Sequence, residues 1–324
     1  MRTIKYMQAI NEAFYQAMRY DHNVFQIGVG INSPWYVGQT TRGLIDAFGE
    51  DRMYDTPVSE NGGMGIAIGA AITGKRPIIT FPRMDFMYYA MDQICNHAAI
   101  LNYTFGGCIT IPLTIRAIIN RGGEQGAQHS QAIQAIFAHI PGIRVVMPAN
   151  AYDAKGMLIA AIEENSPVLY IDDRWLYDSA CDVPDRYYTV PLTGAKVVQE
   201  GTDVTLVASS YMVAESKKAI KTLKLKRVSV ELIDLRSIKP IDEETILSSL
   251  KKTGRLVVAD GGWKTCGVAA EVIAIAAGDG YRYLKSPVER VTLPDIPAAA
   301  SPSLEQCYYP TAEDIVFAVL RCRT

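Results

Sequence analysis

The chain has 324 residues, with 32 Lys and Arg against 34 Asp and Glu, and a formal net charge of −2. Hydrophobic residues make up 49% and charged residues 20%, a composition typical of globular proteins that excludes intrinsic disorder. The near-neutral charge argues against a broad basic surface for nucleic acid or anionic lipid, so we expect neither as a partner. The length suggests two domains.

The cysteines indicate a reducing compartment. All six are scattered along the chain, without a Cys-x-x-Cys pair or a zinc-like spacing to histidine. Their even number also allows disulfides, but such frameworks are typical of small, cysteine-dense secreted proteins. The N-terminal segment 1–18 has helical spacing and charges in place of a secretory signal, and the most apolar stretches are too short to span a membrane. We therefore expect a cytoplasmic protein with reduced cysteines and no membrane segment.

Short apolar runs alternate with longer segments of helical spacing. In chain order, the runs that predict strands are Val24–Gly28, Pro77–Phe81, Ile109–Ile115, Val145–Met147, Val168–Ile171, Val204–Ala208, Val228–Leu235, Leu256–Ala259 and Arg290–Leu293. Helices are expected over Ala90–Leu101, Ser130–Ala138, Ala154–Glu164, Ala214–Leu223 and Glu243–Lys252. Asp153 and Asp242 precede two of these helices, as N-caps do. The alternation predicts an α/β protein with two doubly wound, mainly parallel sheets, whose ligands bind beyond the strand ends.

One segment separates two series of strands and helices. Residues 178–193 contain Pro184 and Pro191 and show little helical or strand spacing. We therefore expect an N-terminal domain over residues 1–185 and a C-terminal domain over residues 186–324.

A single carboxylate precedes a segment rich in glycine and alanine. Glu60 is followed by Asn61-Gly62-Gly63-Met64-Gly65-Ile66-Ala67, and small residues let a flat ligand or another backbone come close. In a buried position Glu60 would favour its protonated form, which can donate a proton to a ring nitrogen. The alternative is that Glu60 only complements the dipole of its helix, which residue type alone favours.

Several motifs follow one another in the order and spacing of a known family. They are Asp55–Glu60 (DTPVSE) with GIAIGAAITGKRPI after it, Met91–Ile94 (MDQI), Gly126–Gln131 (GAQHSQ), Phe137–Gly142 (FAHIPG), Tyr152–Gly156 (YDAKG) and Ile233–Arg236 (IDLR). Through them the chain resembles the β subunit of the thiamine-diphosphate-dependent E1 component of 2-oxo acid dehydrogenase complexes. The resemblance runs almost from end to end. It implies a transketolase-like pyrimidine-binding domain followed by a transketolase-like C-terminal domain.

The resemblance implies roles for individual residues. Glu60 matches the acid that hydrogen-bonds the aminopyrimidine ring of thiamine diphosphate, and Phe86 matches the aromatic ring that packs on it. Ile31 is expected beside the same ring. His129 matches a histidine at the active-site entrance that assists intermediates or acyl transfer, which suits a side chain that titrates near neutral pH. Without the resemblance, Phe86 is equally well a core residue and His129 a helix-capping residue.

The resemblance also implies partners and metals. In the family the diphosphate and its Mg²⁺ are held by another subunit, through Gly-Asp-Gly followed by asparagine. Here no asparagine follows Gly278-Asp279-Gly280, which we interpret as a turn that ends a helix. We therefore expect Mg²⁺ on an α-type partner, an α2β2 heterotetramer, and a lipoyl acyltransferase (E2) as a further partner. A structural K⁺ is implied at Leu113, Ala161, Ile162, Glu164 and Ser166.

The loops expected near the substrate depart from the family. The first strand ends Gly28-Val29-Gly30-Ile31 where the family has two acids, and charged residues stand near Phe86 where the family often has less polar ones. Arg83, Arg116 and Arg121 are therefore candidates for binding a polar or anionic substrate, although Arg116 is equally well part of a surface salt bridge.

Three functions remain open. The first is an E1 β subunit, an oxidoreductase component that decarboxylates a 2-oxo acid such as pyruvate and passes the acyl group to a lipoyl carrier. The second is a two-component transketolase-like transferase acting on a sugar or another polar acceptor, which the lost acids favour. The third is a non-catalytic scaffold, which the retained Glu60, Phe86 and His129 argue against. We expect the first, with activity only in the presence of the α-type partner.

Overall fold

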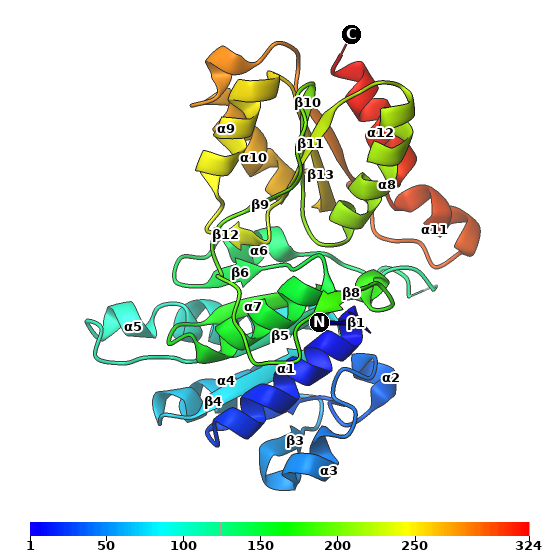
Figure 1. The fold of residues 1–324 in the computed structure, drawn as a ribbon. Helices are drawn as coiled ribbons and strands as arrows, with labels where there is room; N and C mark the ends of the chain where they lie inside the picture. The colour runs from blue at the N-terminus through cyan, green and yellow to red at the C-terminus, as the bar shows by residue number, and fades with distance from the viewer. Residues whose placement is uncertain (124, 324) are drawn as a thin grey trace. The chain divides into compact units, whose positions relative to one another are not determined.

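The computed structural model describes residues 1–123 and 125–323, and only the backbone of Pro34. The chain divides into two units (Figure 1). The first consists of residues 1–121 and 136–192, and the second of residues 122–135 and 193–324. The expected boundary after residue 185 stays a prediction, because the division by contacts falls at residue 192 and also assigns residues 122–135 to the second unit.

The strands of the first unit line up in the order β6-β7-β5-β4-β2-β3, and every neighbouring pair is parallel. Their bounds are β2 Val24–Gly28, β3 Met53–Asp55, β4 Arg76–Phe81, β5 Thr114–Ile119, β6 Arg144–Val146 and β7 Val168–Asp173. The central strands β4, β5 and β7 are buried almost throughout, as parallel strands with both faces covered are. Since β3 and β4 lie on opposite sides of β2, the chain order reverses there, and ligands bind beyond the carboxyl ends of strands at such a point.

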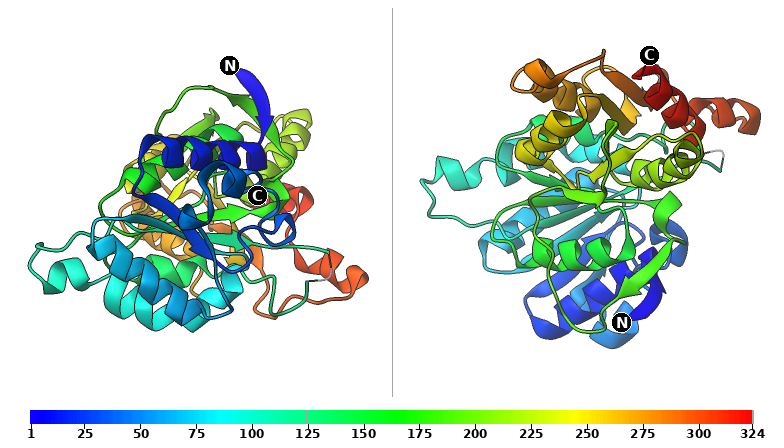
Figure 2. Two further views of the ribbon diagram at one scale, coloured as in Figure 1. Left: turned by 90° about the horizontal axis from the view of Figure 1, so that it is seen from below. Right: turned by 45° about the horizontal axis from the view of Figure 1, so that its top comes forward.

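Helices cover both faces of this sheet. Helix α1 (Tyr6–Tyr20) packs against α7 (Ala151–Glu163) on one face, and α4 (Glu60–Ile72) packs on β4 from the other (Figure 2). The remaining elements are β1 Arg2–Lys5, antiparallel to β8 Ala180–Val183, with α2 Pro34–Val37, α3 Leu44–Phe48, η1 Glu50–Arg52, η2 Met84–Ala90, η3 Gln93–Ala98, α5 Leu101–Thr104, α6 Gln134–His139 and η4 Arg174–Leu176.

The second unit has a sheet in the order β14-β13-β10-β11-β9, parallel except for β9. Helices α9 and α10 lie on one face and α8 and α12 on the other (Figure 1). The bounds are β9 Lys196–Gln199, β10 Val204–Ala208, α8 Tyr211–Leu225, β11 Val230–Asp234, β12 Ser237–Lys239, α9 Glu243–Thr253, β13 Leu256–Trp263, α10 Val268–Ala277, η5 Tyr281–Tyr283, β14 Glu289–Leu293, α11 Pro302–Tyr308 and α12 Ala312–Arg321.

The predicted fold class is confirmed, with differences at individual elements. The predicted strand Ile109–Ile115 instead spans Thr114–Ile119, because Pro112 lacks the N–H that a central strand needs. Asp242 caps α9 by accepting the N–H of Thr245 at 3.0 Å. For α7 the predicted cap was wrong: Asn150 Oδ1 accepts the N–H of Asp153 at 2.9 Å, so Asp153 lies inside the first turn.

The structure also bears on the cysteines, on the Gly278-Asp279-Gly280 segment and on membrane-spanning helices. All six cysteines are free thiols. Gly278 follows α10 directly, so Gly278-Asp279-Gly280 ends a helix as expected. Within residues 1–123 and 125–323, no helix combines the length and the apolar character needed to cross a membrane.

Candidate active site

The carboxyl ends of three neighbouring strands bring the predicted cofactor residues to one edge of the first sheet. Gly28, the last residue of β2, pairs with Asp55, the last residue of β3, and with Thr80, the second-to-last residue of β4. Ile31 comes three residues after β2, Glu60 begins the helix that follows β3, and Phe86 lies in η2 after β4. All three therefore belong to adjacent loops at the reversal point of the sheet.

Glu60 lies at the N-terminus of α4 and is half-buried, as is Phe86, whereas Ile31 is fully buried. Near Glu60 in the chain, large apolar side chains face solvent: Val58 is 77% exposed and Ile66 is 61% exposed. A contiguous apolar patch is typical of a surface that another protein covers, whereas single exposed apolar residues are common on any protein. Glu60 is thus half-buried in the chain by itself.

Residues 32–38 form a strap after β2 that includes α2. In the turn between β2 and this strap, the N–H of Gly30 donates to the carboxylate of Asp55 at 2.7 Å, which fixes the turn to the end of β3. The backbone φ of Gly30 is +66°, and a Cβ there would lie 2.8 Å from two ring atoms of Tyr36. The ring of Tyr36 thus occupies the space that a side chain at position 30, where the resemblance implies an acid, would need.

Gly30→Ala should destabilise the chain more than Gly43→Ala. Both glycines have positive φ, +66° and +75°, but nothing lies within 4 Å of a Cβ at Gly43. The matched pair therefore isolates the collision with Tyr36, for which we expect ~1–3 kcal/mol of additional loss in the free energy of unfolding. Urea unfolding measures both variants. Equal losses would contradict the packing of Tyr36 on the turn.

Arg116 requires a correction. Because β5 begins at Thr114, this arginine lies inside the strand and is fully buried. Its Nε and Nη2 donate to Asp172 at 2.9 Å each, and Nη2 donates to the Tyr177 hydroxyl at 3.1 Å. Burial alone would lower the pKa of Arg116, but the Asp172 carboxylate outweighs it and raises the pKa. The pair lies in the core and is not a surface salt bridge, and a role of Arg116 in substrate binding stays a prediction.

The other predicted arginines lie at strand ends. Arg121 follows β5, and its Nε donates to Asp173 Oδ2 at 2.7 Å with both side chains buried. Arg83 follows β4 and donates from Nη1 to the carbonyl oxygens of Pro82, at 2.9 Å, and of Tyr36, at 3.4 Å. Their roles in substrate binding stay predictions.

Sequence reasoning missed Arg174. This residue directly follows β7, and its Nη2 donates to the carbonyl of Trp35 at 3.1 Å and to that of Tyr36. Two arginines from different strand ends, Arg83 and Arg174, therefore hold the strap through one peptide oxygen. The sequence feature that could have identified Arg174 is its position directly after a predicted strand, because α/β sheets bind ligands at the ends of their strands.

His129 belongs to the stretch 122–135 of the second unit. It is half-buried in a turn, where its N–H donates to the carbonyl of Gly126 at 3.5 Å. The following helix, α6, begins only at Gln134, so His129 is not a capping residue. In the same unit, Gln134 Nε2 donates to the buried Asp260 at 3.1 Å. The catalytic role of His129 stays a prediction.

The predicted K⁺ ligands surround the end of α7. Arg76 Nη1 donates to the carbonyl oxygens of Ile162 and Glu164, at 3.0 and 3.2 Å, and the carbonyl of Leu113 accepts the N–H of Val168 at 3.0 Å. Carbonyl oxygens suit a hard cation such as K⁺, but a guanidinium already places a positive charge against two of these five residues. The K⁺ site stays a prediction.

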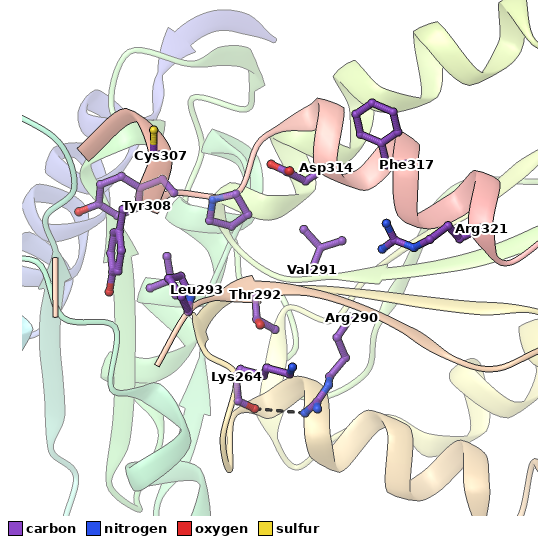
Figure 3. A pocket seen from close by; sticks show the side chains of 13 residues that line it. Lys264, Arg290, Val291, Thr292, Leu293, Cys307, Tyr308, Asp314, Phe317 and Arg321 are labelled. Carbon is purple, nitrogen blue, oxygen red and sulfur yellow. Dashed lines mark hydrogen bonds between the residues drawn. The ribbon is translucent and has the colours of Figure 1, made fainter. Parts of the chain in front are cut away.

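Two open cavities are lined by residues other than those predicted for catalysis. One, of about 510 Å³, lies in the first unit, where Phe25, Tyr54 and Ile66 contribute to its wall. The other, of about 480 Å³, lies in the second unit along β14 and α12 (Figure 3). There Arg290 Nη1 donates to the carbonyl of Lys264 at 3.2 Å.

Comparisons with known proteins decide the family. Residues 2–178 match the family described as transketolase, pyrimidine binding domain, and residues 193–315 match transketolase, C-terminal domain. The chain is 40% identical to the β subunit of acetoin:2,6-dichlorophenolindophenol oxidoreductase from Bacillus subtilis (strain 168), over 98% of this chain and 97% of that one. It is 39% identical to pyruvate dehydrogenase E1 component subunit beta-1, mitochondrial, of Oryza sativa subsp. japonica, over 97% and 85%. The chain belongs to the transketolase-like family of E1 β subunits.

Further relatives agree with this E1 β assignment. The β subunit of the pyruvate dehydrogenase E1 component from Rickettsia bellii is 38% identical over 96% of both chains. A solved structure described as a split-gene transketolase, inactive β4 tetramer, superposes with a TM-score of 0.81 at 23% identity, covering 99% of this chain and 98% of that one. That structure confirms the fold of the E1 β chain.

Proposed function

We propose that this chain is the β subunit of a thiamine-diphosphate-dependent 2-oxo acid dehydrogenase (E1). With an α-type partner it would decarboxylate a 2-oxo acid such as pyruvate and pass the acyl group to a lipoyl carrier. The observation that supports this most is the placement of Ile31, Glu60 and Phe86 on adjacent loops at the reversal point of the sheet, in a chain of the E1 β family. When bound, thiamine diphosphate supplies an electron sink at the carbon that loses CO₂.

The residues present fit the aminopyrimidine half of this cofactor. Phe86 offers a flat apolar face, Ile31 offers a buried apolar wall, and Glu60 offers a carboxyl group at the helix N-terminus. The task of Glu60 is to hold a proton on its carboxyl oxygen and present it to a ring nitrogen, which requires exclusion of water. A half-buried Glu60 therefore needs a second subunit to complete its surroundings.

An α-type partner would bury Glu60 and would also bind the diphosphate and Mg²⁺. The exposed Val58 and Ile66, and the cavity that Ile66 lines, offer it an apolar surface beside Glu60 in the chain. We propose an α2β2 heterotetramer, with E2 as the acceptor of the acyl group. A location in the cytoplasm stays a prediction, since the rice relative carries the word mitochondrial in its name.

Purified alone, the chain should bind thiamine diphosphate weakly, because it holds only half of the site. Mixed with its α-type partner, it should bind the cofactor tightly and only in the presence of Mg²⁺. Isothermal titration calorimetry of both samples measures the difference. Tight, Mg²⁺-dependent binding by the chain alone would contradict the half-site.

A transketolase-like transfer to a sugar or another polar acceptor is the second candidate. It is favoured by the replacement of the family acids with Val29 and Gly30 and by the arginines around the strap. The reconstituted pair distinguishes the two functions: turnover of a 2-oxo acid with an artificial electron acceptor supports the dehydrogenase. Turnover that requires an aldose supports the transferase.

A further inference from the structure

A buried carboxylate in the second unit holds a part of the chain that is far away in the sequence. Asp260 lies in β13 and is 2% exposed, and Gln134 is buried as well. Asp260 Oδ1 accepts from Gln134 Nε2 at 3.1 Å and from the N–H of Gly262 at 3.0 Å. Its Oδ2 accepts the N–H of Ala269, in the first turn of α10, at 3.2 Å. One side chain thus joins β13, α10 and the stretch 122–135.

Asp260 lies where sheets of this kind bind ligands. Since β11 and β13 lie on opposite sides of β10, the chain order reverses there, as it does beside β2 in the first unit. Asp260 directly follows Ala259, which pairs with Ala208, the last residue of β10. At the reversal point of the second sheet, the acceptor is therefore engaged by a glutamine of the stretch 122–135.

The same stretch approaches the second unit closely on both sides of His129. A Cβ at Gly262 would lie 2.9 Å from Gln134 Nε2, so a side chain at position 262 would displace this amide. On the other side, a Cβ at Gly126 would lie 3.5 Å from the Cβ of Ala300. The turn that carries His129 therefore lies between two segments that pack against the second unit.

We propose that Asp260 and Gln134 are positioning residues that fix His129 for its part in the reaction. This inference rests on the proposed function, in which His129 assists intermediates or acyl transfer, and deepens it. A side chain that takes part in catalysis must be held within about 0.5 Å of its productive geometry, and supporting hydrogen bonds provide this. The bond from Gln134 to a buried carboxylate fixes the chain shortly after His129, and a bond to a charged acceptor is stronger than one between neutral groups.

Hydrogen exchange of the reconstituted complex tests the anchoring without turnover. We would compare wild type, Gln134→Met and Gln199→Met by mass spectrometry, since methionine has about the length of glutamine but cannot donate from its end. Gln199 is the matched control: it is half-buried in the same unit, and its Nε2 donates to the carbonyl of Val230 at 3.3 Å. Peptides from 122–135 should exchange at least about tenfold faster in Gln134→Met and at the wild-type rate in Gln199→Met. Equal exchange in wild type and Gln134→Met would overturn the proposal.

A double-mutant cycle with His129→Ala shows whether the anchor acts through this histidine. The reaction is followed with a 2-oxo acid and either lipoamide or an artificial electron acceptor. In whichever reaction His129→Ala slows, Gln134→Met should lower kcat about ten- to a hundredfold and leave KM nearly unchanged. It should have no further effect in a chain that already carries His129→Ala, because residues that act as one unit are not additive. Gln199→Met should keep the wild-type kcat.

Equal losses from Gln134→Met in the presence and absence of His129 would show that the glutamine only stabilises the fold, and would overturn the proposal. Wild-type turnover of His129→Ala in both reactions would overturn it as well. Faster exchange of 122–135 in Gln134→Met, combined with no decarboxylation by wild type, would refute the proposed function while supporting the anchoring of the stretch.

Discussion

Glu60→Gln should leave the reconstituted enzyme folded and lower its kcat with a 2-oxo acid by about a hundredfold or more. General acid–base groups contribute roughly 10²–10⁴-fold to catalysis, and an amide has no carboxyl proton to present to the ring nitrogen. If Glu60 only complemented the dipole of α4, the same change would cost stability, about 0.3–1 kcal/mol, and spare turnover. Steady-state assays with an artificial electron acceptor, together with the melting temperature, separate the two roles.

Glu243→Gln is the matched control for this experiment. Glu243 is the first residue of α9, just as Glu60 is the first residue of α4, but it lies in the second unit on an exposed turn. We expect kcat of this variant to remain that of wild type. Near-normal turnover of Glu60→Gln, or an equal loss in both variants, would remove the special role of Glu60.

Arg116→Met should destabilise the first unit by about 3–5 kcal/mol, because it leaves the Asp172 carboxylate buried without its counter-charge. The Tyr177 hydroxyl would still donate to that carboxylate. The double variant Arg116→Met/Asp172→Asn removes both charges and should recover a large part of the loss. Urea unfolding of the two variants measures the difference. If the single variant lost less than about 1 kcal/mol in the free energy of unfolding, the buried Arg116–Asp172 pair would not stabilise the core as proposed.

The sequence pattern predicts the bounds of two strands whose short, mainly apolar runs contain no proline. Val24–Gly28 and Val204–Ala208 have the predicted bounds. The pattern is misleading near Pro112, because an apolar run looks the same whether or not its backbone can join a ladder. Because of that shift, Arg116 lies inside the strand and in the core, whereas the sequence pattern placed it at the end of the strand.

The positions of Ile31, Glu60 and Phe86 after three strands could be predicted from the sequence, because the motif DTPVSE and the strand ends are local features, and their contact with a cofactor stays a prediction. The strap could not, since its position depends on contacts between residues far apart in the chain. Tyr36 is joined to Arg83 and Arg174 through a backbone oxygen, which no side-chain pattern encodes. The assignment of residues 122–135 to the second unit is likewise a matter of tertiary contacts, and the strand–helix alternation carries no sign of it.

Release of CO₂ from carbon 1 of a 2-oxo acid tests the assignment most directly. The purified chain would be mixed with its α-type partner, thiamine diphosphate, Mg²⁺ and a dye that accepts electrons, across a panel of neutral, dicarboxylic and phosphorylated 2-oxo acids. We predict CO₂ release that requires both subunits and the cofactor. Release by the chain without a partner, or no release from any member of the panel, would contradict an E1 β subunit.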